Sequence, residues 1–156
     1  MLSSFTKTQN NDDIMNTTTA AVLTPHPAPN PQRDPITCHV LDLTTGRPAP
    51  SFDVSLTLIR PLGPSNPFRA TTTSDGRIST WNAQEGPSLS EIFANLAEHE
   101  DGKMVWSLKF ETGAYYGEGN TFFPEVEIRF FVHPHSGHYH VPLLLGPWSY
   151  TTYRGS

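Results

Sequence analysis

From residue 36 onward, the sequence consists of short segments in which apolar and polar residues alternate, separated by glycine, proline and other turn-forming residues. Alternation with a period of two is typical of a β-strand that buries one face. The segments are 36–43, 52–60, 68–73, 77–81, 104–110, 125–132, 138–145 and 148–153. Seven or eight short strands at this spacing predict an all-β sandwich.

Residues 88–98 have the period of a helix instead. Their apolar side chains recur three and four residues apart on one face: Leu89, Ile92, Phe93 and Leu96. Ser88 or Ser90 can cap this helix, and Glu91 stands at capping-box spacing from Ser88. A short helical turn is also expected within 119–124. The sandwich is therefore expected to carry one or two short helices.

The pair Asp75-Gly76 lies between the segments 68–73 and 77–81. An Asp-Gly pair between two strand-like segments predicts a β-hairpin. Arg77 directly follows the turn and has two interpretations. It is either an exposed residue at the end of a hairpin, or a binding group whose forked donors suit a carboxylate or a carbonyl-rich ring.

The domain is expected to begin near residue 35. Residues 1–35 contain five prolines but only one aromatic side chain, Phe5, whereas the other 16 aromatic residues follow later. A segment with so few large apolar groups cannot offset the entropy lost on ordering. We therefore expect residues 1–34 to be a disordered N-terminal extension, either without function or a targeting or docking arm, and 35–156 to be the domain.

Charge and composition exclude several classes of protein. The net charge is −5 and no cluster of Lys or Arg is present, so no nucleic-acid partner is expected. The single cysteine excludes an internal disulfide framework and a cysteine-based zinc site. No apolar run has the length of a membrane span, and the first twenty residues lack the apolar stretch of a secretory signal. We expect a cytoplasmic protein without membrane contact.

The first strand carries apolar residues on both faces. Cys38 and Val40 point to one face, and His39 and Leu41 to the other. The segment 138–145 is also apolar on both sides. In a sandwich, one face packs in the core, so the other must form a groove or meet a second subunit. An isologous oligomer is the simplest solution.

Four of the seven histidines lie within residues 133–140. On a strand, His138 and His140 share a face and can bind one metal ion. A proline and a glycine in the segment predict a turn, which would place His133 and His135 at the surface. A metal site on this strand is therefore one alternative, and a set of solvated surface histidines is the other.

His39 lies in the middle of an apolar strand, where it is either a hydrogen-bonded interface residue or a proton-transfer group. Its neighbour Cys38 points to the opposite face, which argues against a nucleophile–base pair. The sequence contains no nucleophile elbow, phosphate-binding loop or dinucleotide fingerprint.

The last residues, 149–156, are rich in aromatic and β-branched side chains. Chain ends are usually disordered unless they are held by contacts. We therefore expect this terminus to be docked on the domain. The terminal carboxylate and the hydroxyl of Ser156 are then candidate functional groups.

Four motifs, in order, resemble those of a known family. They are His39-Val40-Leu41-Asp42 followed by Gly46-Arg47-Pro48-Ala49, Thr73-Ser74-Asp75-Gly76-Arg77, His138-Tyr139-His140-Val141-Pro142-Leu143-Leu144-Leu145, and the terminal Tyr153-Arg154-Gly155-Ser156. Together they resemble the 5-hydroxyisourate hydrolases, transthyretin-like enzymes of urate degradation. The resemblance spans residues 36–156. The connection at about 84–103 and the extension 1–34 depart from it without touching the motifs.

The resemblance implies a transthyretin-like sandwich of two four-stranded sheets and a homotetramer with its sites at subunit interfaces. It implies hydrolysis of a purine-derived substrate, 5-hydroxyisourate, to 2-oxo-4-hydroxy-4-carboxy-5-ureidoimidazoline, with no cofactor and no metal. The catalytic residues of the family fall on His39, Arg77 and His140. Its substrate-binding motif, which would line the site across a subunit interface, falls on residues 153–156, namely Tyr153, Arg154, Gly155 and Ser156.

Under this interpretation His39 and His140 serve as base and proton shuttle, in an order that the sequence leaves open, and Arg77 stabilises the intermediate. Two alternatives remain: a non-enzymatic carrier of small ligands of the transthyretin type, and a metalloenzyme built on His138 and His140. For localisation, the peroxisome is the alternative to the cytoplasm, although the terminal Arg-Gly-Ser differs from the Ser-Lys-Leu type of peroxisomal signal.

Overall fold

The computed structural model describes residues 33–61, 63, 65–98 and 102–156. The predicted extension therefore lies outside the described residues, except for its last two members, Arg33 and Asp34. The backbone N–H of Asp34 donates to the carbonyl of Ser79 at 2.8 Å, and its carboxylate accepts from the backbone N–H of Trp81 at 2.7 Å. Asp34 is thus bound to the domain through both its backbone and its side chain.

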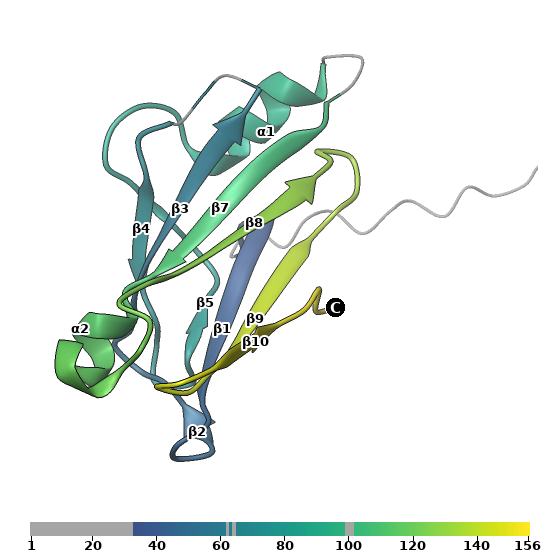
Figure 1. Ribbon diagram of the computed structural model, residues 1–156. Coiled ribbons are helices and arrows are strands. Elements are labelled where there is room, and N and C mark those ends of the chain that lie inside the picture. Colours follow the sequence, from purple (N-terminus) through teal and green to yellow (C-terminus); the bar gives the residue numbers. More distant parts are fainter. Residues whose placement is uncertain (1–32, 62, 64, 99–101) are drawn as a thin grey trace, which may run out of the picture.

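Two β-sheets face each other in a sandwich (Figure 1). The first, called the β1 sheet, contains β10 (Tyr150–Thr152), β9 (Tyr139–Leu145), β1 (Ile36–Asp42) and β2 (Arg47–Pro48) in this order, with β5 (Arg77–Ile78) also paired to β1. The second, called the β3 sheet, has the order β6 (Asn82–Ala83), β4 (Phe68–Thr71), β3 (Asp53–Arg60), β7 (Met104–Phe110) and β8 (Val126–Val132). The predicted all-β sandwich is confirmed.

Each sheet has five strands rather than the four expected. The additional strands are two residues long, because turns directly after β1 and β5 return the chain briefly to a sheet edge. Such short edge strands leave little unpaired backbone, which limits unwanted pairing with other chains. The difference therefore concerns the borders of the sheets and not the sandwich itself.

The core lies between the sheets and follows the alternation in the sequence. In β1, the side chains of Ile36, Cys38 and Val40 are fully buried, whereas His39 points to the opposite face and is only half-buried. Because successive strand residues point to opposite faces, one face of β1 fills the core and the other is left for a site. The largest fully buried side chain of the core, Trp106, lies on β7.

Helix α1 (Leu89–Ala97) lies at one end of the sandwich (Figure 1), and its buried residues belong to the predicted apolar face. Its buried residues include Phe93, whose ring centroid lies 6.0 Å from that of Trp106. Ser88 is the N-cap and forms the predicted capping box with Glu91. The box satisfies two backbone N–H groups that the first turn cannot pair internally, which fixes where the helix begins.

The predicted hairpin at Asp75-Gly76 is wrong. A tight turn does form, in which the N–H of Thr73 donates to the carbonyl of Arg77 at 3.0 Å. However, β4 pairs with β3 in one sheet, and β5 pairs with β1 in the other. The turn therefore carries the chain from one sheet to the other.

Packing against β1 explains this crossing. Ile78 of β5 is buried in the core, and Gly76 has a φ of +73° that favours glycine. A Cβ on Gly76 would lie 2.5 Å from the carbonyl oxygen of Val40. The turn thus fits directly against β1, and this contact directs the next strand to β1 instead of back to β4.

A helix that the sequence analysis missed, α2 (Thr112–Tyr116), is held to the end of β1. The hydroxyls of Tyr115 and Tyr116 donate to the buried carboxylate of Asp42 at 3.2 and 2.9 Å, and Thr44 donates to it as well. These donors lower the pKa of Asp42, although burial acts against them as the largest single factor. The predicted helical turn appears slightly earlier, as η1 (Glu118–Asn120).

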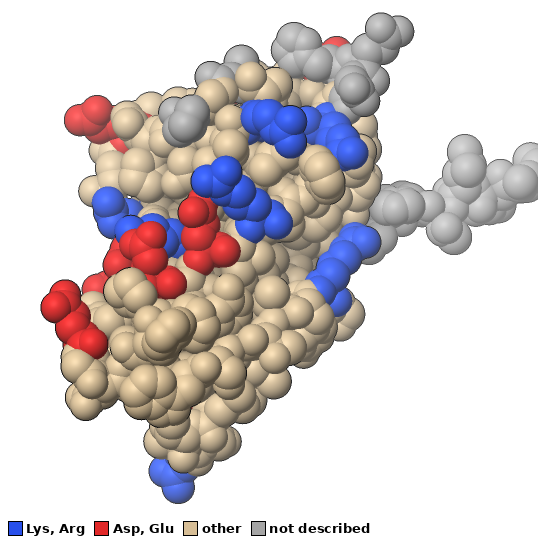
Figure 2. All heavy atoms as spheres, viewed as in Figure 1, with Lys and Arg blue, Asp and Glu red and all other residues tan. Residues whose placement is uncertain are grey.

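Neither helix in the described part of the chain has the length and apolar character needed to cross a membrane. The face drawn in Figure 2 shows acidic and basic side chains beside one another over its middle, with a largely uncharged region below them. Among the ion pairs of the described residues, Lys109 contacts Glu111 at 3.3 Å and Glu125 at 2.6 Å. Exposed ion pairs of this kind contribute little stability.

Candidate functional site

Three neighbouring strands bring the predicted catalytic residues together on the outer face of the β1 sheet. Antiparallel pairing of β5 with β1 places Arg77 directly opposite His39. Parallel pairing of β9 with β1 places His140 opposite Thr37, two residues before His39 on the same face. His39, Arg77 and His140, which are 38 to 101 positions apart in the sequence, thus converge on one patch of the sheet.

The imidazole rings of His138, His140 and His39 form a row along this face. Ring centroids are 6.3 Å apart between His138 and His140, and 6.5 Å apart between His140 and His39, with interplanar angles of 22° and 29°. Thr37 connects two of the rings, since its hydroxyl lies 2.9 Å from Nε2 of His138 and 2.8 Å from Nδ1 of His140. Hydrogen bonds through Thr37 therefore link His138 and His140 within the row.

An arginine lies at each end of the row. Nη2 of Arg33 is 3.1 Å from Nδ1 of His138, and Arg77 lies opposite His39. Burial, together with the nearby charge of Arg77, lowers the pKa of His140 to about 4. The pKa values of His39 and His138 are also lowered, in each case by burial first and then by the nearby arginine. All three imidazoles are thus neutral near pH 7.

The two histidines predicted to be catalytic have different environments. Nδ1 of His140 is occupied by the hydroxyl of Thr37, and only 8% of the residue is exposed. Nε2 of His39 is buried and has no hydrogen-bond partner among the described residues. A buried polar atom without a partner is costly, so it marks a position that a substrate or water can satisfy.

Arg77 points its guanidinium toward open solvent. The side chain is 51% exposed, and its only ion pair within the described residues is a 3.7 Å contact with Asp75. A forked, permanently charged donor that is not held by a buried carboxylate can bind an anionic or carbonyl oxygen of a ligand. The outer face of the β1 sheet therefore combines three neutral imidazoles with an exposed guanidinium.

The C-terminal tetrapeptide returns to the histidine row of its own chain. After β10, Gly155 forms an isolated bridge with His140, and its N–H donates to the carbonyl of His140 at 2.9 Å. The guanidinium carbon of Arg154 lies 5.1 Å from the ring centroid of Tyr139. The predicted docking of the terminus is thus seen within a single chain, and Figure 1 shows the C-terminus beside β9.

A family model described as the HIUase/Transthyretin family matches residues 36–155. The chain belongs to this family. A probable 5-hydroxyisourate hydrolase of Schizosaccharomyces pombe is 38% identical over 82% of this chain and 96% of its own length.

Solved structures of the HIUase/Transthyretin family show the same fold. The 5-hydroxyisourate hydrolase of Klebsiella pneumoniae has a TM-score of 0.54 and 29% identity, and covers 78% of this chain and 97% of its own. Transthyretin from Sparus aurata has a TM-score of 0.60 and 26% identity, and covers 79% of this chain and 97% of its own. The family resemblance inferred from four motifs is confirmed, as is the transthyretin-like sandwich.

The metal alternative on His138 and His140 has little support from the geometry. The two rings do share a face, as predicted, but each directs a ring nitrogen to the hydroxyl of Thr37. Over residues 33–61, 63, 65–98 and 102–156, no three His, Cys, Asp or Glu side chains are grouped to hold an ion. A zinc site needs three or four such ligands.

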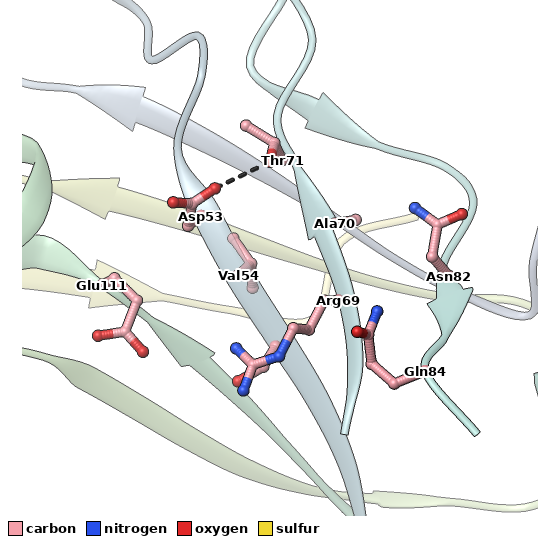
Figure 3. A pocket seen from close by; sticks show the side chains of 9 residues that line it. Asp53, Val54, Arg69, Ala70, Thr71, Asn82, Gln84 and Glu111 are labelled. Atoms are coloured by element: carbon pink, nitrogen blue, oxygen red, sulfur yellow. Dashed lines mark hydrogen bonds between the residues drawn. The ribbon is translucent and has the colours of Figure 1, made fainter. Parts of the chain in front are cut away.

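A polar hollow of about 480 Å³ lies elsewhere, on the outer face of the β3 sheet. Asp53 accepts a hydrogen bond from the hydroxyl of Thr71 at 2.8 Å, and Arg69 on β4 and Glu111 directly after β7 also line the hollow (Figure 3). None of its lining residues is a histidine or belongs to the predicted site. The hollow and the histidine row are therefore in different sheets.

Two residues that contact the histidine row, Thr37 and Arg33, were not identified as site residues from the sequence. Thr37 lies two residues before His39, so the period-two rule already placed both on one face, but the threonine carried no chemical signal of its own. Arg33 was assigned to the extension. Its contact with His138 depends on a residue 105 positions away, which local patterns do not reveal.

Proposed function

We propose that the chain hydrolyses 5-hydroxyisourate to 2-oxo-4-hydroxy-4-carboxy-5-ureidoimidazoline, as a step in urate degradation. The observation that carries this proposal is the convergence of His39, Arg77 and His140 from three strands on one face. Relatives named 5-hydroxyisourate hydrolase support it, with 38% identity in Schizosaccharomyces pombe and 36% in Mus musculus.

The reaction opens a cyclic amide, and the site holds the groups that this chemistry requires. Water attacks the carbonyl carbon, so that a C–O bond forms while one of the two imidazoles accepts a proton from the water. The ring C–N bond then breaks, and the leaving nitrogen receives that proton. The products of this bond exchange are the carboxy and ureido groups of the named product. Since His39 and His140 are both neutral near pH 7, either ring has the protonation state of a base.

Arg77 stabilises the negative charge that develops on the substrate oxygen. Its guanidinium lies beside His39 and faces away from the core, where it can contact the carbonyl or an anionic oxygen of a bound purine derivative. Removing one preorganised donor to such an oxyanion typically lowers kcat by about 10²–10³. The terminal residues Tyr153, Arg154, Gly155 and Ser156 would line the substrate pocket beside His140, and no metal or cofactor takes part.

A homotetramer completes the site in this proposal. The outer face of the β1 sheet carries Leu41 and the 48% exposed Leu43 next to the histidine row. Tyr153 is 57% exposed, so in a single chain much of its ring faces solvent. A second copy packed on this face would cover the apolar side chains and enclose the substrate between subunits.

A coupled assay tests the function directly. 5-Hydroxyisourate is generated from urate with urate oxidase, and its ultraviolet decay is followed with and without this protein and with and without a chelator. We expect decay that is faster than in buffer and insensitive to the chelator. The variant His140→Gln should lose at least about 10²-fold in rate.

The matched control is His133→Gln, because His133 is exposed in the turn before β9 and lies outside the row. It should keep the rate of the unmodified chain. A decay equal to the buffer rate for the unmodified protein would refute the hydrolase and favour a carrier of the transthyretin type. Loss of activity on chelation would instead favour the metalloenzyme.

A further inference from the structure

A chain of hydrogen bonds leads from Arg33 to His140 through two other side chains. Nη2 of Arg33 lies 3.1 Å from Nδ1 of His138, Nε2 of His138 lies 2.9 Å from Oγ1 of Thr37, and that hydroxyl lies 2.8 Å from Nδ1 of His140. Thr37 is only 3% exposed, so water has little access to replace its contacts. Each member of the chain therefore depends on the one before it.

The arginine determines the direction of every bond in the chain. A guanidinium only donates, so Nδ1 of His138 must accept from Arg33. Neutral His138 then carries its proton on Nε2 and donates it to Oγ1 of Thr37. The single hydroxyl proton of Thr37 is left to point at Nδ1 of His140, which accepts it. Neutral His140 must then carry its own proton on Nε2.

We propose that Arg33, His138 and Thr37 are positioning residues that fix His140 as its Nε2–H tautomer, so that His140 acts as a neutral hydrogen-bond donor and His39 acts as the base. This inference rests on the proposed hydrolase function for the roles of the two histidines. It goes beyond that function because it assigns the roles and attributes them to three residues outside the catalytic set.

The charged and titratable groups around His140 are compatible with this assignment. They are Arg77 on β5, His39 on β1, His138 directly before β9, and Arg33, and each of them disfavours a protonated His140. The C-terminal segment contacts His140 through the backbone, because the N–H of Gly155 donates to the carbonyl of His140. In the described part of the chain, Nδ1 is thus committed to Thr37, and Nε2 is the ring nitrogen left to face a substrate.

The division of roles balances the reaction. His39 takes the proton from water through its buried and unpartnered Nε2, and returns that proton to the ring nitrogen that leaves. His140 donates a hydrogen bond from Nε2 to the carbonyl oxygen as charge develops there, and keeps its proton throughout. A neutral imidazole in this role polarises a carbonyl without being deprotonated.

Nitrogen NMR of the histidine-labelled protein tests the tautomer without using activity. At pH 8.5, well above the ordinary histidine pKa of about 6.5, the ¹⁵N shifts distinguish a protonated from an unprotonated ring nitrogen. We expect His140 to carry its proton on Nε2 in the unmodified protein. An Nδ1–H signal for His140 would overturn the proposal, whatever the activity.

Two substitutions of His138 by residues of similar size test the direction of the hydrogen bonds. His138→Gln preserves this direction, and His138→Glu reverses it. In His138→Gln, the side-chain oxygen accepts from Arg33 and the amide N–H donates to Thr37, as the imidazole does. In His138→Glu, the carboxylate only accepts, so Thr37 must donate to it and accept from Nδ1–H of His140. We expect His140 to remain the Nε2–H tautomer in the first variant and to become the Nδ1–H tautomer in the second.

The kinetic test uses the same pair together with Thr37. We expect His138→Glu and Thr37→Val to lower kcat by at least about tenfold with little change in KM, because a wrong tautomer removes the transition-state contact. His138→Gln and Thr37→Ser should retain most of kcat, and the control His133→Glu should not differ from the unmodified chain. Full kcat in both disruptive variants would overturn the proposal.

These measurements separate the inference from the function on which it rests. If the unmodified protein shows no hydrolysis, the proposed function fails. The NMR result still decides whether the hydrogen bonds from Arg33 to His140 set the tautomer of His140. If hydrolysis is rapid but His138→Glu leaves both the tautomer of His140 and kcat unchanged, the proposed function stands and the positioning role of Arg33, His138 and Thr37 is refuted. Circular dichroism of each variant checks that the sandwich is folded.

Discussion

At the scale of single residues, the site is defined by neutral imidazoles held beside permanent cations. Arg33 and Arg77 lie at opposite ends of the row, and burial with these charges lowers the pKa of each histidine. Keeping the rings neutral near pH 7 preserves both a base and a neutral donor. The same arrangement costs stability in acid, because a protonated His140 would be buried beside like charges.

The stability of the protein should therefore fall between pH 6.5 and about 4. The pKa of His140 is about 4 in the folded state and close to 6.5 in an unfolded chain, so the unfolded state binds more protons in this range. The free energy of unfolding then decreases as the pH falls, and His140 alone should contribute on the order of 1 kcal/mol between pH 7.5 and pH 5. Urea unfolding at the two pH values, at fixed protein concentration, measures this change.

The variant His140→Gln removes the titrating group and serves as the comparison. Its midpoint should shift less with pH than that of the unmodified chain. His133→Gln, at an exposed position, should show the unmodified pH dependence. Equal shifts for the unmodified chain and His140→Gln would mean that the folded structure does not lower the pKa of this ring.

At the scale of elements, the geometry of the site depends on which strands pair with one another, and not only on where the strands lie in the sequence. The strand segments were predicted closely: β7 occupies residues 104–110 as expected, and β1, β3, β8 and β9 begin or end within one residue of their predicted limits. The partner of β5 was predicted wrongly, since the Asp75-Gly76 turn crosses between sheets. This crossing is what places Arg77 opposite His39. An ordinary hairpin would have left Arg77 in the other sheet.

The terminal segment is the second element that builds the site, and Gly155 is its point of closest approach. A Cβ at this position would lie 2.7 Å from Cδ2 of His140 and 3.1 Å from Cγ of Pro142. Gly155→Ala should push the segment away from the His140 ring. We expect kcat/KM to fall by about tenfold or more, because small displacements in an active site are costly, while the urea midpoint changes little.

Gly146→Ala provides a matched control for this prediction. It introduces the same methyl group near the other end of β9, where the nearest backbone atom would be 3.5 Å away, an ordinary contact distance. This variant should keep its activity. A fully active Gly155→Ala protein would show that the bridge between Gly155 and His140 is not needed for catalysis.

At the scale of the whole molecule, the outer face of the β1 sheet is the proposed contact between subunits. In a single chain, exposed large side chains remain on and around the β1 sheet, including Leu43 at 48%, Trp148 at 70% and Tyr153 at 57%. Exposed apolar patches of this kind mark interaction surfaces. The neighbouring histidine row would then be enclosed by the partner that covers them.

We expect the native mass in solution to be four times the 17.3 kDa of one chain. Light scattering coupled to size exclusion measures it. Leu43→Glu places a charge in the proposed contact and should shift the protein to smaller species, because burying an unpaired carboxylate is unfavourable. A 17.3 kDa species at all concentrations of the unmodified chain would refute the tetramer.

Local sequence patterns were sufficient to predict which residues form strands, where α1 begins, which face of β1 enters the core, and which family the chain resembles. These properties depend on neighbours within a few positions, through alternation, capping by Ser88 and short motifs. The pairings and contacts that build the site depend instead on three-dimensional packing. β5 leaves β4 for β1, β9 runs parallel to β1 with His140 opposite Thr37, and Arg33 reaches His138. The residues of the last two contacts are 103 and 105 positions apart. Their register is set by packing across the whole sandwich, to which no local pattern refers.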